Sequence, residues 1–197
     1  MGLGPINLEA DRFLFLRKDR LDMNRDKFFD EEWKEIKKSI KENKGKLNLV
    51  DILRIHNYKV NVRIIPTKNW DDTVNKINMA LEVANEDILE ALKILTEDID
   101  GIGIPIASAL LSMRYPEEFA IIDINCVKAI LKEHKILFKI SIDDYSNYNK
   151  FMKEEFAKEK GKYKELRGFE FNMFKRGRKI SKKEHKNRIK ELKKLNQ

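Results

Sequence analysis

Two glycines stand directly before an apolar, helix-like run and could bind a phosphate group. Gly101 and Gly103 alternate with isoleucine, and Pro105 follows where a helix would begin. Glycine allows backbone angles that a side chain would block, and proline suits the first turn of a helix. The N–H groups at such a helix start bind phosphate oxygens well. We therefore expect a tight hairpin between two helices over 99–107. The backbone groups expected to contact phosphate belong to Gly101, Gly103, Ile104 and Ile106.

A single carboxylate follows the hairpin at the next turn of the chain. Asp123 comes after the apolar run 120–122 and directly before a helical pattern that begins at Ile124. An aspartate in this position is often a helix N-cap, whose carboxylate accepts backbone N–H bonds. An ionised carboxylate can also stabilise positive charge that develops in a reaction. Both roles stay open for Asp123.

The stretch 99–123 resembles the helix-hairpin-helix and Gly/Pro–Asp motif of the base-excision DNA glycosylase superfamily, which includes endonuclease III and the adenine and alkylpurine glycosylases. In that superfamily a glycine hairpin precedes a helix of small residues, and an aspartate follows in a context such as Val-Asp-Thr-x-Val. Here the matching residues 121–127 are Ile-Ile-Asp-Ile-Asn-Cys-Val. The chain departs from the pattern at Pro105 and Ile106, where the superfamily usually has lysine and threonine, and it lacks a four-cysteine cluster.

The resemblance implies a specific role for Asp123. It would stabilise an oxocarbenium-like sugar and orient the attacking water, after the target base has been flipped out of the duplex. Bifunctional members carry a lysine two positions after the second glycine, which here is Pro105. A Schiff base cannot form there, so the resemblance implies a monofunctional glycosylase or a degenerate relative. With a single cysteine, the chain is expected to hold no iron–sulfur cluster, and the hairpin is a candidate site for a monovalent cation.

The charge of the chain favours a polyanionic partner. Lysine and arginine exceed aspartate and glutamate by eight, and charged residues make up 38% of the chain. Such an excess favours nucleic acid, here double-stranded DNA, although lysine- and glutamate-rich surfaces also occur in thermophile proteins. The run 173–179 places aromatic residues beside dense positive charge, and a solvated tail is the alternative interpretation. Candidate DNA-contacting residues are Arg114, Tyr115, Lys175, Arg176, Arg178 and Lys179.

Cysteine and histidine usage argues against a metal centre or a disulfide. Cys126 is the only cysteine and lies among apolar residues, so we expect a buried, inert thiol. His56, His134 and His185 are far apart, and we expect no metal site. Because the chain has no run of eighteen apolar residues and no basic-then-apolar start, we expect a soluble, cytoplasmic protein that does not enter a membrane.

Helical periodicity dominates the elements that must position these residues. Residues 60–65 form the one strand-like run, with extended loop as the alternative. The last segment, from 162 onward, is expected to be helical in part and very basic. The other predicted helices span 8–21, 30–43, 48–55 with Asn48 as cap, 70–84, 86–97 with Asn85 as cap, 105–113, 124–134, and a long stretch from Ser141 or Asp143 to 160.

These patterns predict an all-α protein with the two-subdomain helical fold of DNA glycosylases. The hairpin would lie on the rim of a central cleft and Asp123 would face it. Residues 1–180 would form one unit, with the hairpin at about 87–113 and the Asp-bearing turn at about 116–134, followed by a basic helix or tail at 181–197. The leading hypothesis is a DNA-binding protein that acts as a monofunctional N-glycosylase. The alternatives are a non-catalytic DNA- or protein-binding relative, and a structural protein that keeps the hairpin only for packing.

Overall fold

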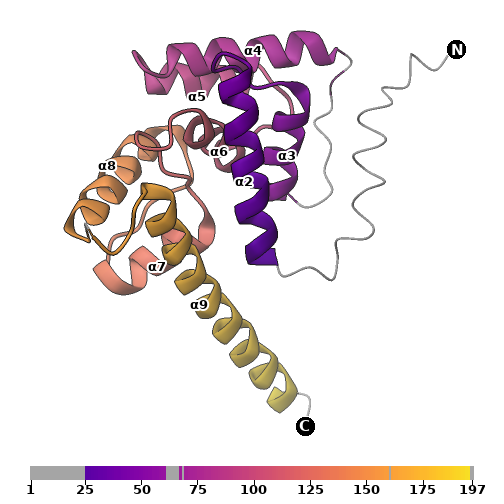
Figure 1. The fold of residues 1–197 in the computed structure, drawn as a ribbon. Coiled ribbons are helices and arrows are strands. Elements are labelled where there is room, and N and C mark those ends of the chain that lie inside the picture. The colour runs from indigo at the N-terminus through magenta and orange to yellow at the C-terminus, as the bar shows by residue number, and fades with distance from the viewer. Residues whose placement is uncertain (1–24, 61–66, 68, 160, 196–197) are drawn as a thin grey trace, which may run out of the picture.

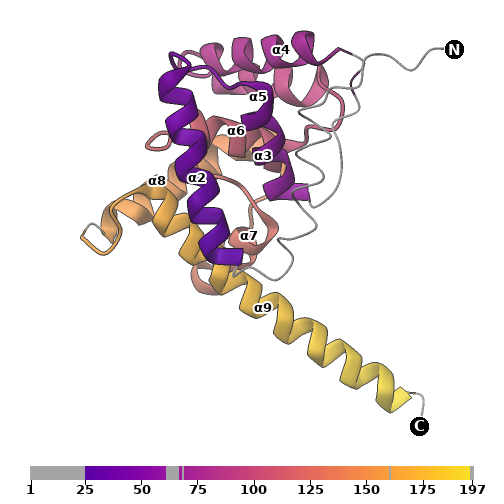
Figure 2. The same ribbon diagram turned by 45° about the vertical axis from the view of Figure 1, so that its right-hand side comes forward.

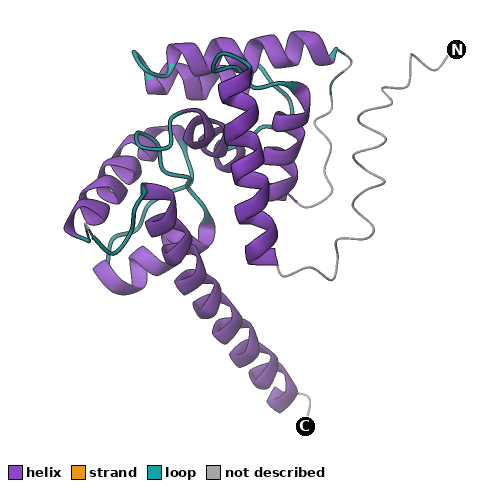
Figure 3. Cartoon of the chain, viewed as in Figure 1, coloured by secondary structure: helices purple, strands orange, loops and turns teal. Residues whose placement is uncertain are grey.

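The described part of the chain is helical throughout its regular secondary structure (Figure 3). The computed structural model describes residues 25–60, 67, 69–159 and 161–195, so the predicted helix at 8–21 and residues 61–65 of the strand-like run lie outside it. The all-α prediction is confirmed. The helices are α2 (Arg25–Glu42), α3 (Leu49–Val60), α4 (Trp70–Val83), α5 (Ile88–Glu97), α6 (Ile104–Arg114), α7 (Ile124–His134), α8 (Ile142–Lys158) and α9 (Leu166–Leu195).

The caps show where local sequence signals were sufficient. Asn48 accepts the N–H of Asp51 at 2.9 Å, and Ser141 caps α8, as predicted. The cap predicted for Asn85 is wrong, because Asp87 caps α5 by accepting the N–H groups of Leu89 and Glu90, each at 3.0 Å. The side chain of Asn85 donates instead to the hydroxyl of Tyr115, at 2.9 Å.

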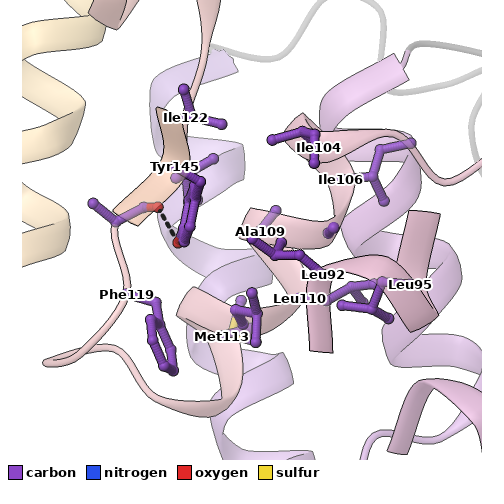
Figure 4. Close-up of a cluster of buried hydrophobic side chains, with 14 of the residues drawn as sticks. Leu92, Leu95, Ile104, Ile106, Ala109, Leu110, Met113, Phe119, Ile122 and Tyr145 are labelled. Atoms are coloured by element: carbon purple, nitrogen blue, oxygen red, sulfur yellow. Dashed lines mark hydrogen bonds between the residues drawn. The ribbon is translucent and has the colours of Figure 1, made fainter. Parts of the chain in front are cut away.

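Helix α6 forms the centre of the core. Its residue Ile104 and all residues from Ile106 to Met113 are buried. A helix that is apolar on every side must be enclosed by other elements, and α2, α3, α4 and α5 all pack against it. Figure 4 shows Leu92 and Leu95 of α5 beside one side of α6, and Phe119 and Ile122 of the following segment beside another.

The helices form two neighbouring groups in Figures 1 and 2. Helices α2 to α6 make the first group, around α6. Helices α7, α8 and α9 make the second, in which α9 packs along α7, and contacts between α5 and α8 join the two groups. The predicted boundary at residue 181 falls inside α9, which continues through it as one helix and extends away from the other helices in both views.

We expect the free energy of unfolding to decrease as the pH is lowered below the ordinary pKa of histidine. The residue responsible is His56 on α3. This side chain is 2% exposed, and burial lowers its pKa below the usual 6.5. Below pH 6.5, His56 therefore takes up a proton more readily in the unfolded chain than in the folded chain. As a result, the free energy of unfolding decreases as the pH falls below 6.5. Urea unfolding over this pH range should show the decrease for the wild type and for His185→Gln, whose side chain is exposed. His56→Leu should flatten it, and an unchanged slope in His56→Leu would contradict this assignment.

Candidate functional site

The predicted hairpin joins α5 to α6. Gly101 has a φ of +82°, a left-handed conformation that favours glycine, and the N–H of Ile102 donates to the carbonyl of Ile99 at 3.3 Å. The side chains of Ile99 and Ile102 are buried and anchor the turn, whereas Gly101 and Gly103 are exposed. An exposed pair of glycines is the arrangement that a hairpin needs for contact with an external ligand.

At the start of α6, only backbone groups form the capping hydrogen bonds. The carbonyl of Gly103 accepts the N–H groups of Ile106 at 2.9 Å and Ala107 at 3.0 Å. The amide of Ile106 is therefore used inside the helix, which narrows the expected set of phosphate donors. The amides of Gly101, Gly103 and Ile104 have no backbone acceptor within the described ranges. These three amides are the donors left for a phosphate.

The segment 120–122, between α6 and α7, is buried and extended without a partner strand in the described residues. Buried backbone amides need acceptors, and here side chains supply them. Three helices contribute one acceptor each. The hydrogen bonds run from Ala120 N–H to Asn149 Oδ1 (2.7 Å), from Ile121 N–H to Glu170 Oε2 (3.0 Å) and from Ile122 N–H to Ser108 Oγ (3.2 Å).

Two buried tyrosines of α8 satisfy carbonyl groups of the same segment. The hydroxyl of Tyr145 donates to Ala120 O at 2.8 Å, the dashed line in Figure 4, and that of Tyr148 donates to Ile121 O at 2.9 Å. Burial raises the pKa of both tyrosines well above the usual range, so both hydroxyls stay protonated donors. Side chains from α6, α8 and α9 thus fix the strand-like segment that leads into Asp123.

This segment brings Asp123 to the same end of α6 as the hairpin. It runs antiparallel to α6, so that Phe119 lies near Met113 while Ile122 lies toward Ile104 (Figure 4). The bond from Ile122 to Ser108 fixes that register, because Ser108 is in the second turn of α6. The hairpin and the carboxylate, which are separate in sequence, therefore occupy one region.

Asp123 is the N-cap of α7, and its side chain is half-buried. Its Oδ1 accepts the backbone N–H of Asn125 at 2.8 Å and the side-chain amide of Asn125 at 3.0 Å. The amide oxygen of Asn125 in turn accepts the hydroxyl of Ser181, at 3.1 Å. The capping role is confirmed, and this chain of hydrogen bonds connects the carboxylate to α9.

Helix α9 crosses the start of α7 at very short range. A Cβ atom placed on Gly177 would lie 1.7 Å from the carbonyl oxygen of Asn125, so only glycine fits there. Ion pairs extend the contact, from Arg176 to Glu133 at 2.5 Å and from Lys128 to Glu184 at 2.7 Å. Arg176, predicted to contact DNA, is thus paired with α7.

The structure places Arg114 and Tyr115 away from the hairpin. They lie at the far end of α6, about 15 Å along the helix axis from Ile104. The hydroxyl of Tyr115 donates to Leu81 O at 3.0 Å, and the Arg114 guanidinium lies over the Tyr115 ring at 4.8 Å. Both residues are therefore separated from Asp123 by the length of α6, and the hydroxyl of Tyr115 has its partners at the junction of α4 and α5.

A shallow groove of about 290 Å³ lies between α5 and α8. Ile88 and residues from Tyr145 to Glu154 line it, and Asp123 is not among them. The described residues contain no group of three or more histidine, cysteine, aspartate or glutamate side chains placed to hold a metal ion. Within those residues, no helix has the length and apolar character needed to cross a bilayer.

The residues that position Asp123 were not identified from sequence as positioning residues. These residues are Tyr145 and Tyr148 of α8 and Ser108 of α6. The signal that could have found them is the apolar run 119–122, which is too short for a helix and has no neighbouring strand pattern. Such a run requires side-chain hydrogen-bond partners when it is buried.

Comparisons of this chain with protein-family models, with curated proteins and with solved structures find no match.

The close crossing at Gly177 predicts a strong effect of a single methyl group. Gly177→Ala should lower the free energy of unfolding by about 2–3 kcal/mol, because the backbone of Asn125 cannot yield as a flexible side chain would. Gly168→Ala is the matched control, since its Cβ would lie 3.7 Å from Tyr163 and alanine favours helix by up to about 1 kcal/mol. Chemical denaturation of both variants measures this difference, and equal stability of the two would contradict the crossing.

Proposed function

We propose that the chain is a DNA-binding helix-hairpin-helix protein with the DNA glycosylase fold, and that it acts as a monofunctional N-glycosylase. The observation that carries the proposal is the position of Asp123 at the same end of α6 as the exposed hairpin, set by the bond from Ile122 to Ser108. A group that holds the DNA backbone and a group that acts on one nucleotide must lie close together. The motif resemblance supplies the class of reaction.

The hairpin is proposed to hold one DNA strand by its phosphates. The amides of Gly103 and Ile104 lie at the positive end of the α6 dipole, and Gly103 places no side chain between them and a phosphate oxygen. Ile99 and Ile102, buried beneath the turn, keep it in place. Such contacts position a duplex without reading its sequence.

Asp123 is proposed to act on the sugar of a flipped nucleotide. As the bond between C1′ and the base nitrogen breaks, its electron pair leaves with the base, and the carboxylate stabilises the sugar cation. Water held by the same carboxylate then adds to C1′, and its proton balances the charge of the departing base. Proline at position 105 provides no amine, so the product is an intact strand with an abasic site.

A non-catalytic DNA-binding relative is the second candidate, and one observation favours it. The Oδ1 atom of Asp123 already accepts two hydrogen bonds from Asn125, which is what a purely structural N-cap does. In this case the hairpin would bind DNA in the same way, and the carboxylate would only begin α7. The two candidates agree on binding and differ on base release.

The catalytic proposal predicts base release that depends on Asp123. The purified protein should be incubated with duplexes that carry uracil, hypoxanthine, 8-oxoguanine, alkylated bases or mismatches, and alkali then reveals abasic sites as strand breaks. Asp123→Asn keeps the N-cap but removes the charge, so we expect base release to fall by about 100-fold or more with unchanged folding. If Asp123→Asn produces as many strand breaks as the wild type, the role assigned to Asp123 is wrong. If the wild type releases no base from any of these duplexes, the non-catalytic DNA-binding relative is the remaining candidate.

The hairpin proposal predicts a binding defect without a folding defect. A Cβ at Gly103 would come no closer than 3.8 Å to its nearest neighbour, Pro105, and the backbone there has an ordinary negative φ. Gly103→Ala should therefore fold normally, while its methyl group obstructs the approach of a phosphate and weakens duplex binding by about tenfold, or about 1.4 kcal/mol. Fluorescence anisotropy with an undamaged duplex measures the affinity. If Gly103→Ala binds the duplex with wild-type affinity, the hairpin does not contact DNA.

A further inference from the structure

The exposed face of α9 carries a continuous line of positive charge. Lys175, Lys179, Lys182 and Lys186 follow one another at spacings of four, three and four residues, which places them on one side of the helix. All four are exposed, and together with Arg178 and Lys183 we call them the basic stripe. From Lys175 to Lys186 the stripe is about 16 Å long.

The basic stripe lies opposite the face of α9 that packs on α7. Met173, Gly177, Ser181 and Glu184 recur at spacings of four, four and three residues, and Gly177, Ser181 and Glu184 contact α7. Gly177 is about 140–180° around the helix from Lys175, Lys182 and Lys186, at 100° per residue. The stripe is therefore directed outward by the same contacts that fix α9 on α7.

Within the described residues, the five members of the stripe from Arg178 to Lys186 form no ion pair with an acidic side chain. Between residues 171 and 187 the only acidic residue is Glu184, which pairs with Lys128 of α7 at 2.7 Å. Elsewhere lysines are matched with glutamates, as in the pairs Lys37–Glu165 and Lys153–Glu118. An ion-paired surface of the kind found in thermophile proteins thus describes other faces of the molecule but not this one.

The chemistry of the stripe favours nucleic acid over a lipid bilayer. A helix that lies on a membrane inserts an apolar face. The apolar residues of α9 at Phe169 and Met173 are instead buried within the protein, which leaves the cationic face for the partner. A rigid row of cations on a straight helix matches the regular row of phosphates along a duplex, whose charges repeat every 1.7 Å or so of axis.

We propose that the basic stripe of α9 is a second duplex-binding surface, which contacts the DNA phosphate backbone independently of the hairpin. It extends the proposed function, on which it rests for the choice of DNA as the polyanion. The crossing at Gly177 ties this helix to the backbone of Asn125, next to Asp123, so DNA held by the stripe has a fixed relation to the carboxylate. Its contribution is electrostatic and independent of base sequence.

The test compares two triple variants that remove the same charge at similar helical spacing. Lys179→Gln, Lys182→Gln and Lys186→Gln remove half of the stripe, and Lys34→Gln, Lys38→Gln and Lys41→Gln change three exposed lysines along α2. Binding to an undamaged duplex is measured by anisotropy over a series of salt concentrations. For three lost phosphate contacts, the slope of log K against log salt should become shallower by about 2.7 in the stripe variant. The α2 variant should keep the wild-type slope.

Each result either supports or rejects DNA binding by the basic stripe. Equal slopes in the two variants, with both melting like the wild type, would overturn the proposal. So would unchanged duplex binding together with reduced binding to phosphatidylserine vesicles, which would assign the stripe to a membrane. The duplex is undamaged, so a shallower slope supports the stripe even if no base is ever released, and base release with equal slopes rejects the stripe alone.

Discussion

The site depends on one constraint, which is that a buried, extended backbone must have its hydrogen bonds satisfied without a neighbouring strand. Residues 120–122 meet it with five bonds to side chains from α6, α8 and α9. An unpaired buried amide costs about 1–3 kcal/mol, so each of these bonds selects strongly for one arrangement of the helices around the segment. The position of Asp123 follows from that arrangement, since it is the next residue.

Glu170 of α9 connects this hydrogen-bond network to helix α2. It is 2% exposed, yet its carboxylate accepts the N–H of Ile121 and pairs with Arg167 at 2.6 Å. The Arg167 guanidinium also lies 4.7 Å from the centre of the Trp33 ring on α2. A buried carboxylate is tolerated only when charge and hydrogen bonds compensate its desolvation, and here that compensation joins α2, α9 and the segment before Asp123.

Local signals predicted most of the helices and part of the site. The span of α7 was predicted to the residue, because Asp123 caps its start and the apolar stripe ends with it, and the hairpin followed from the types of Gly101 and Pro105. Interactions between distant segments could not be predicted in this way. In the sequence, Gly177 lies within a basic run that could be a solvated tail. Its contact with Asn125 could not be predicted, because that contact depends on how α9 crosses α7. The contact of Tyr115 could not be predicted for the same reason, since its partner Leu81 lies 34 positions away in the chain.

The network around residues 120–122 also sets an order for assembly on the ribosome. The chain emerges from its N-terminal end, and the amide of Ile121 appears 49 positions before the Glu170 carboxylate that accepts it. Helices α2 to α6 can collapse in that interval, because their mutual contacts are already synthesised. The Ile121 amide must meanwhile be hydrated, which keeps this segment out of the core. Asp123 therefore reaches its final place only after the first turns of α9 have been made.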